Sequence, residues 1–456
     1  MAQIRKDLTT GGISRTMLSF CFPVFLSALL QALYGSADTI LVGQFSSLCD
    51  IAGVTQGSQV MNIVTQGISG ISTGACVLIG QYLGAGKQKD LDETISTVFT
   101  LFLAIAAFLM IVLQLLNSSF ASILHISEEA VPSFNAYMVV CEMGIVFIFM
   151  YNCTAAVLQA LGDSKHPLVF VGISCTLNIV LDFVLIAGFD MGALGAAIAT
   201  VFSQFISVVL CLVFLRRQKF SFDFKPSSFK LHRDKAGRIF ELGLPYAIQR
   251  VLVYCSFTAI SGLANMYGLE AGSAAGIVAK INSFATIPFS AFNVGVSTIC
   301  AQCCGKKDIE RAKKTMFTGL ALCLACGGSL FAVCQLFPRT VLAIFTSNKE
   351  LIETGVPFLR GYSFEYIFMP FTWSIHGLYS GFGQTLIPSI DGILASVVFR
   401  TPLALFFSRT VGMGFGGIAF GAAVAVWGAM VPAWSIYFSG IWKKWIRGGS
   451  KNEKPL

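Results

Sequence analysis

Charged side chains are scarce in this sequence. Only 12% of its 456 residues are Asp, Glu, Lys or Arg, and 55% are hydrophobic, whereas soluble domains carry roughly 25% charged residues. The mean hydropathy of +0.75 agrees with this deficit. The composition therefore excludes an ordinary soluble domain and indicates a polytopic membrane protein.

Motifs for nucleotide, metal or catalytic chemistry are also missing. The glycines of residues 83–87 lack the preceding strand and the spacing of a phosphate loop. Cys300 and Cys303 form a CxxC without a second Cys or His pair nearby, and most of the fourteen cysteines lie in apolar segments, as reduced packing residues do. We find no nucleophile–base set or acid cluster at an interface, which argues against a membrane-embedded lipid-modifying enzyme. No cofactor is expected.

Long apolar segments divide the chain into twelve predicted spans. Each contains at least the roughly 20 residues that a helix needs to cross a bilayer. Residues 1–15 are polar and run directly into a segment too long for the hydrophobic region of a cleavable signal, so we expect the first helix to be retained. The segments lie near residues 16–43, 52–80, 94–117, 131–161, 166–188, 192–215, 238–266, 272–303, 315–337, 355–382, 387–408 and 414–442.

Basic residues orient these spans. Of the 31 Lys and Arg, 24 fall in the termini and in the loops on the same side, whereas the opposite loops hold Arg339, Lys349 and Arg409. Basic loops stay in the cytoplasm, so both termini are expected there, in a bacterial inner membrane. This location also explains the net charge of +8 without a nucleic-acid partner.

Four polar residues are predicted to lie at one height in the membrane. Asp38 interrupts the first apolar segment, Asn178 and Asp182 share one helix face at i, i+4 spacing, and Thr200 lies in the sixth segment. At 1.5 Å per residue, Asp38, Asp182 and Thr200 are about 8, 9 and 12 Å inside their extracellular helix ends. Two carboxylates, an amide and a hydroxyl suit Na⁺ or a shared proton. The alternative for Asp38 is a helix-end acid that reaches the outer interface.

A basic connection separates two similar halves. Pro23 and Pro245 are 222 residues apart, and Gln81 and Gln302 are 221 apart. Six spans per repeat give both halves the same orientation, as parallel repeats. We therefore expect an all-α fold of two six-helix bundles, with a cytoplasmic N-terminus at 1–15, an N-lobe at 16–215, a linker at 216–237, a C-lobe at 238–442 and a cytoplasmic C-terminus at 443–456.

The second half lacks these acids and carries intramembrane cations instead. Lys280 and Arg400 fall near mid-span, where each must face a cavity or find an acceptor such as Glu365 or Asp391. Cavity-lining and structural-pair interpretations both stay open for them. The roles of Arg250, His376 and Glu142 stay open. We expect His376 to be packed or hydrogen-bonded, and Glu142 to be either a titrating group or a satisfied interhelical acceptor.

Together these features resemble the MATE family, multidrug and toxic compound extrusion. The resemblance covers the whole chain and depends on Pro23 fifteen residues before Asp38, on Asn178-x-x-x-Asp182, on Arg400-Thr-Pro-Leu and on the order of the spans. One departure is Gln249, where some members carry a carboxylate in the seventh helix, so a C-lobe cation site is not expected.

The resemblance implies a function and several site residues. It implies a cation-coupled antiporter, driven by Na⁺ or H⁺, that exports amphipathic, often cationic, compounds by alternating access and works in the lipid bilayer, expected as a monomer. A lipid-linked oligosaccharide flippase is the alternative. Asp38, Asn178, Asp182 and Thr200 match the cation site; Tyr34, Tyr137 and Asn152 match cavity residues, joined by Lys280 and Arg400; Pro23 is the expected hinge.

Overall fold

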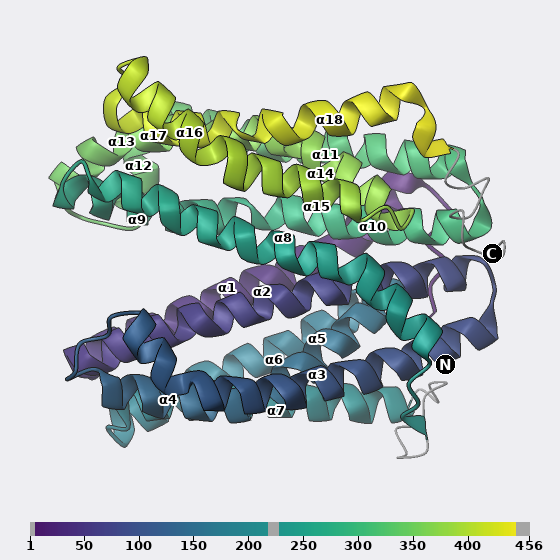
Figure 1. The fold of residues 1–456 in the computed structure, drawn as a ribbon, viewed down its shortest axis with the longest axis horizontal. Coiled ribbons are helices and arrows are strands. Elements are labelled where there is room, and N and C mark those ends of the chain that lie inside the picture. The colour runs from purple at the N-terminus through teal and green to yellow at the C-terminus, as the bar shows by residue number, and fades with distance from the viewer. Residues whose placement is uncertain (1–4, 218–227, 444–456) are drawn as a thin grey trace. The chain divides into compact units, whose positions relative to one another are not determined.

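The computed structural model describes residues 5–217 and 228–443, and these residues form helices without a strand (Figure 1). The described part of the expected linker is therefore limited to residues 216–217 and 228–237, and that of the C-terminus to residue 443. The first eight elements are α1 (Ile13–Phe45), α2 (Leu48–Gly84), α3 (Gln88–Ile123), α4 (Val131–Met143), α5 (Ile145–Ala160), α6 (Lys165–Asp182), the π-helical turn η1 (Phe183–Gly188) and α7 (Gly192–Arg217).

The second half repeats this order with more breaks. It consists of α8 (Arg233–Asn265), α9 (Leu269–Ala285), α10 (Ile287–Lys306), α11 (Ile309–Leu336), α12 (Pro338–Ala343), α13 (Lys349–Ser363), α14 (Glu365–Gly381), α15 (Leu386–Ile393), η3 (Leu394–Phe399), α16 (Arg400–Leu405), η4 (Phe406–Thr410), α17 (Gly414–Val424), α18 (Val426–Ser439) and η5 (Ile441–Lys443).

These elements account for the twelve predicted spans. In the described ranges, ten helical stretches are long and apolar enough to cross a membrane, and the pair α4 and α5, bent by 47°, makes an eleventh. The predicted span 355–382 corresponds to α13 and α14, which stop on either side of Phe364, so neither helix reaches the length of a complete span alone. The multi-pass all-α fold is thus confirmed, and several of its spans consist of two or more shorter helices.

The repeat is visible in the way α5 and α14 end. Gly162 and Gly383 both adopt the left-handed conformation, with φ of 89° and 76°. In each case the next residue donates its N–H to a carbonyl five residues earlier, from Asp163 to Leu158 and from Gln384 to Tyr379, both at 2.9 Å. This is the Schellman ending that glycine favours, and it recurs at the spacing that the sequence predicts.

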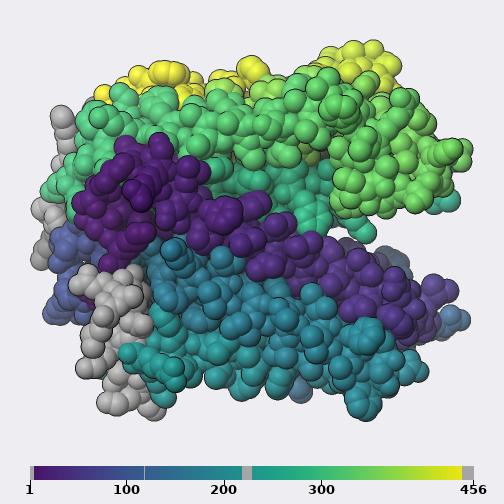
Figure 2. All heavy atoms as spheres, turned by 180° about the vertical axis from the view of Figure 1, so that it is seen from behind, coloured from purple at the N-terminus to yellow at the C-terminus, as the bar shows by residue number. Residues whose placement is uncertain are grey.

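The described chain forms two compact units. Unit 1 is built mainly from Leu26–Ile79 and Lys87–Glu241, and unit 2 from Asp7–Phe25, Gly80–Gly86 and Leu242–Leu456. Within each unit the long helices run side by side (Figure 1), and on the face drawn in Figure 2 side chains close the spaces between neighbouring helices of a unit.

These units differ from the predicted lobes at three short segments, of which residues 238–241 group with unit 1. Residues 16–25 and 80–86 group with unit 2, where Met17 and Phe20 belong to its apolar core. The residues just before α1 are bound there too, because Lys306 pairs with Asp7 at 2.7 Å. Although burial acts to raise it, hydrogen bonds from Lys306 and Thr9 hold the pKa of Asp7 below its usual value.

Two glycines allow a close backbone contact within unit 2. A Cβ on Gly84 would lie 2.1 Å from the carbonyl oxygen of Gln302, and a Cβ on Gly305 would lie 2.1 Å from the carbonyl oxygen of Gln81. The contact is reciprocal because these residues are repeat equivalents. Helices approach this closely only where small residues face each other, so both positions require glycine.

We predict that Gly305→Ala destabilises the protein. Its methyl group would meet backbone atoms of α2, which do not move aside as a flexible side chain does, and such overpacking costs about 1–3 kcal/mol. The measurement is the midpoint of thermal unfolding in detergent. The control is Gly237→Ala in α8, where a Cβ meets nothing within 4 Å and the helix gains roughly 0.5–1 kcal/mol. Equal midpoints for the two variants would contradict the close contact.

Candidate functional site

Four polar side chains from three helices meet inside unit 1. Asp38 lies on α1, Asn178 and Asp182 on α6, and Thr200 on α7. All four are buried, Asn178 and Asp182 completely. Thr200 donates its hydroxyl to Oδ2 of Asp38 at 3.3 Å. The structure thus brings together the four residues that the sequence placed at one height, while their role in coupling stays a prediction.

Asn178 links the two carboxyl groups. In the amide orientation that satisfies its neighbours, its nitrogen donates to Oδ1 of Asp38 at 3.0 Å and to Oδ2 of Asp182 at 3.1 Å. The Asp38 and Asp182 carboxyl groups are also within hydrogen-bonding reach of each other. Two carboxyl groups so close are stable in an apolar region when they share a proton or hold a cation between them.

The local sequence explains how these groups converge. The i, i+4 spacing on α6 puts Asn178 and Asp182 on one face, and α6 packs against α7. The start of α7 is rich in glycine and alanine, with Ala196, Ala197 and Ala199 completely buried. These small side chains let the helices approach closely enough for Thr200 to reach Asp38 across the helix boundary.

Two of the predicted cavity residues border this cluster. The hydroxyl of Tyr34 is a neighbour of the Thr200 hydroxyl and of the Asp38 carboxyl group, and buried Tyr137 is a neighbour of both Tyr34 and Asp38. Asn152 behaves differently, because its side chain donates to the carbonyl of Ile148 in its own helix at 2.8 Å. The predicted cavity role of these three residues is not tested by their placement.

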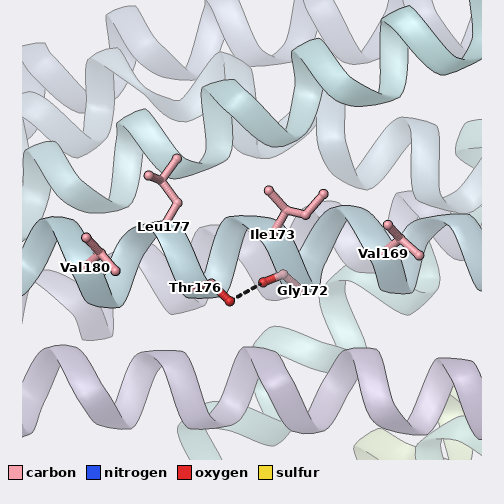
Figure 3. A pocket seen from close by; sticks show the side chains of 6 residues that line it. All are labelled: Val169, Gly172, Ile173, Thr176, Leu177 and Val180. Atoms are coloured by element: carbon pink, nitrogen blue, oxygen red, sulfur yellow. Dashed lines mark hydrogen bonds between the residues drawn. The ribbon is translucent and has the colours of Figure 1, made fainter.

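An open apolar pocket of about 540 Å³ follows the other face of α6 (Figure 3). Thr176 adds a hydroxyl to it but donates this to the carbonyl of Gly172 at 2.9 Å. Because successive helix residues are about 100° apart, these side chains point away from Asn178 and Asp182. The lining contains none of the predicted cavity residues; it consists of Val169, Gly172, Ile173, Thr176, Leu177 and Val180.

In unit 2, Arg400 forms an ion pair with Glu365. Its Nη2 lies 3.0 Å from Oε1 of Glu365, and the two side chains are 6% and 0% exposed. The guanidinium carbon also lies 4.3 Å from the centroid of the Phe257 ring, a cation–π contact. These contacts favour the structural-pair interpretation of Arg400 over the cavity-lining one. Lys280, by contrast, is exposed on α9 and makes no ion pair with any residue in the described ranges.

Three residues without an assigned role have distinct surroundings. His376 is hydrogen-bonded, as expected, with Nε2 at 3.2 Å from Oδ2 of Asp391. Arg250 neighbours Tyr246, and its buried Nε has no hydrogen-bond partner among the residues that the structure describes. Glu142 is fully buried in unit 1, and within the same described residues neither of its carboxyl oxygens has a partner.

The sequence did not indicate a second acidic node in unit 1. Oδ1 of Asp50 accepts the hydroxyl of Ser133 at 2.8 Å and the backbone N–H of Ala193 at 3.3 Å. Asp50 therefore ties α2 to α4 and caps the start of α7, a favourable place for a negative charge. The adjacent Gly192, with φ of 49°, leaves room for this carboxylate. In the sequence, Gly192 after Met191 is the one feature that could have indicated a close contact at the start of α7.

A family model and several known proteins match this chain along most of its length. The family model MatE matches residues 23–184 and 245–406. The chain is similar to the probable multidrug resistance protein YoeA of Bacillus subtilis, with 25% identity over 448 residues that cover 97% of this chain and 96% of YoeA. It is equally similar to the probable multidrug resistance protein NorM of Thermotoga maritima, with 25% identity over 441 residues, 95% of this chain and 94% of NorM.

A solved structure shows the same fold. A MATE in its bent conformation superimposes with a TM-score of 0.89 at 20% identity, covering 97% of this chain and 98% of that chain. Since the family model matches well over half of the sequence, the chain belongs to the MatE family. It is therefore a membrane transporter and not an enzyme, and these relatives do not favour the flippase alternative.

Proposed function

We propose that this protein is an antiporter that exports amphipathic, often cationic, compounds in exchange for Na⁺ or H⁺. The observation that carries the proposal is the buried cluster of Asp38, Asn178, Asp182 and Thr200. The names of YoeA and NorM, both probable multidrug resistance proteins, support drugs as substrates. We place the protein in a bacterial inner membrane with both termini in the cytoplasm, as a monomer.

The Asn178 amide suits either ion. Its nitrogen donates to both carboxyl groups, which suits a site that holds at most a proton. If a cation entered the site, rotation of the amide would present its oxygen to that cation instead. Oxygens of Asp38, Asp182, Asn178 and Thr200 then converge from three helices, as a Na⁺ site requires.

Transport requires that ion and substrate bind the two access states differently. Pro23 supplies a place for this change, since it interrupts the hydrogen bonding of α1. The chain passes from unit 2 to unit 1 between Phe25 and Leu26, just after this proline. Asp38 lies fifteen residues further along the same helix, so ion occupancy and helix bending are coupled through α1.

We predict that Asp38→Asn and Asp182→Asn each reduce cation-driven efflux to background while the protein stays folded and inserted. Each variant keeps the size of the side chain but removes the charge that holds the ion. The measurement is export of a cationic dye from proteoliposomes down a Na⁺ or pH gradient. Glu142→Gln, which neutralises another buried acid of unit 1, should retain efflux. Wild-type rates in both aspartate variants would refute the coupling assignment.

A second experiment decides between the ions. Efflux is measured in vesicles under an imposed Na⁺ gradient at clamped pH, for wild type, Asn178→Ala and Thr200→Ala. If Na⁺ is the coupling ion, the gradient accelerates efflux, and losing either neutral oxygen weakens the apparent Na⁺ affinity. Efflux that ignores Na⁺ and both substitutions identifies H⁺, because a proton needs the carboxyl groups alone.

We further predict that Pro23→Ala slows transport. Alanine restores the missing hydrogen bond and straightens α1, so the exchange between access states becomes slower. Distances between spin labels on the two sides of the membrane should shift toward one state. Pro432→Ala, at a helix-interior proline that lies wholly within unit 2, is the control. Unchanged transport and unchanged distance distributions would exclude the hinge role.

A further inference from the structure

Around the candidate site, the two halves of the chain align at a spacing of 222 residues, to within one residue. The family model matches begin at residues 23 and 245 and end at 184 and 406, so both ends differ by 222. The helices agree with this offset to within one residue. The starts of α7 and α17, Gly192 and Gly414, are 222 apart, and those of the turns η1 and η4, Phe183 and Phe406, are 223 apart. Positions in unit 1 can therefore be assigned equivalents in unit 2.

At this offset the four site positions change character. Asp38, Asp182 and Thr200 correspond to Ile260, Ala404 and Ala422, which are all buried and apolar. Asn178, the residue that links the two acids of unit 1, corresponds to Arg400. Unit 2 has therefore lost the oxygen ligands at three positions and gained one fixed positive charge at the fourth.

The contacts of Arg400 follow the same pattern. Asn178 reaches from α6 to Asp38 on α1, and Arg400 reaches across to Phe257 on α8, the helix equivalent to α1. Its charge is balanced by Glu365, at 3.0 Å. Within the described residues, Nε and Nη1 of Arg400 and Oε2 of Glu365 have no hydrogen-bond partner. The Tyr362 hydroxyl also neighbours Glu365, and the Asn282 amide donates to that hydroxyl at 3.4 Å. Even with these neighbours, the pair retains donors and an acceptor without partners in the described residues.

We propose that the Arg400 guanidinium is a tethered cation that occupies, in unit 2, the place that the coupling ion takes in unit 1. This inference rests on the proposed function. Because a guanidinium group stays charged and is covalently held, unit 2 neither takes up nor releases an ion. Ion exchange is then confined to Asp38 and Asp182, and each transport cycle is driven through one unit.

The test removes the guanidinium group by substitution of Arg400 and supplies a free cation in solution. Arg400→Ala leaves Glu365 buried and unpaired, so its thermal midpoint in detergent should fall. Methylguanidinium or Na⁺, each compared with choline at constant ionic strength, should bind beside Glu365 and restore at least half of the lost midpoint in a saturable manner. Wild type and Arg409→Ala, which removes an exposed arginine of the same unit, should show no saturable response.

Further variants keep the outcome decisive. Arg400→Ala combined with Glu365→Gln removes both charges, so it should fold even if the single variant does not, and it should show no cation response. The response of Arg400→Ala should persist when Asp38→Asn and Asp182→Asn are added, which separates it from the coupling site of unit 1. The proposal is overturned if neither cation stabilises Arg400→Ala, or if the response survives Glu365→Gln.

Discussion

The cost of an ion in an apolar environment determines where this chain places its polar side chains. An ionised group at membrane depth costs at least about 2.5–3.5 kcal/mol, so each one needs a partner. Arg400 is neutralised by Glu365 and stacked on Phe257. Asp38 and Asp182 have each other and the amide of Asn178. The difference is that the charges of Arg400 and Glu365 balance each other, whereas two ionised carboxyl groups repel each other unless a proton or a cation lies between them.

Both arrangements are built on the same backbone frame. The repeated Schellman endings at Gly162 and Gly383, and the reciprocal contact of Gly84 and Gly305, show that the backbone is shared between halves. Glycine is favoured at Gly162 and Gly383 because φ is positive there, and at Gly84 and Gly305 because a Cβ would meet backbone atoms. These requirements are independent of what the units bind. A duplicated frame can therefore keep its packing while the few side chains at one helix junction change their chemistry.

The sequence predicts those features that depend on length, spacing or charge distribution. The twelve apolar segments and the convergence of Asn178 and Asp182 on Asp38 follow from hydrophobic runs, helical rise and i, i+4 spacing. It does not predict the break at Phe364. It also does not predict the capping role of Asp50, because this role depends on a contact with a distant helix. The choice of Glu365 as the partner of Arg400 was open for the same reason.

Helix α1 carries both the proposed hinge, Pro23, and the first residue of the polar cluster, Asp38. Its first part packs into the core of unit 2 through Met17 and Phe20, and its second part carries Asp38 in unit 1. A bend at Pro23 therefore moves Asp38 relative to a segment that is held in place. Since Thr200 and Asn178 hold Asp38 from two other helices, losing or gaining an ion changes the contacts that fix this second part. In the mechanism that we propose, one carboxylate and one proline, fifteen residues apart on a single helix, link ion occupancy to helix direction.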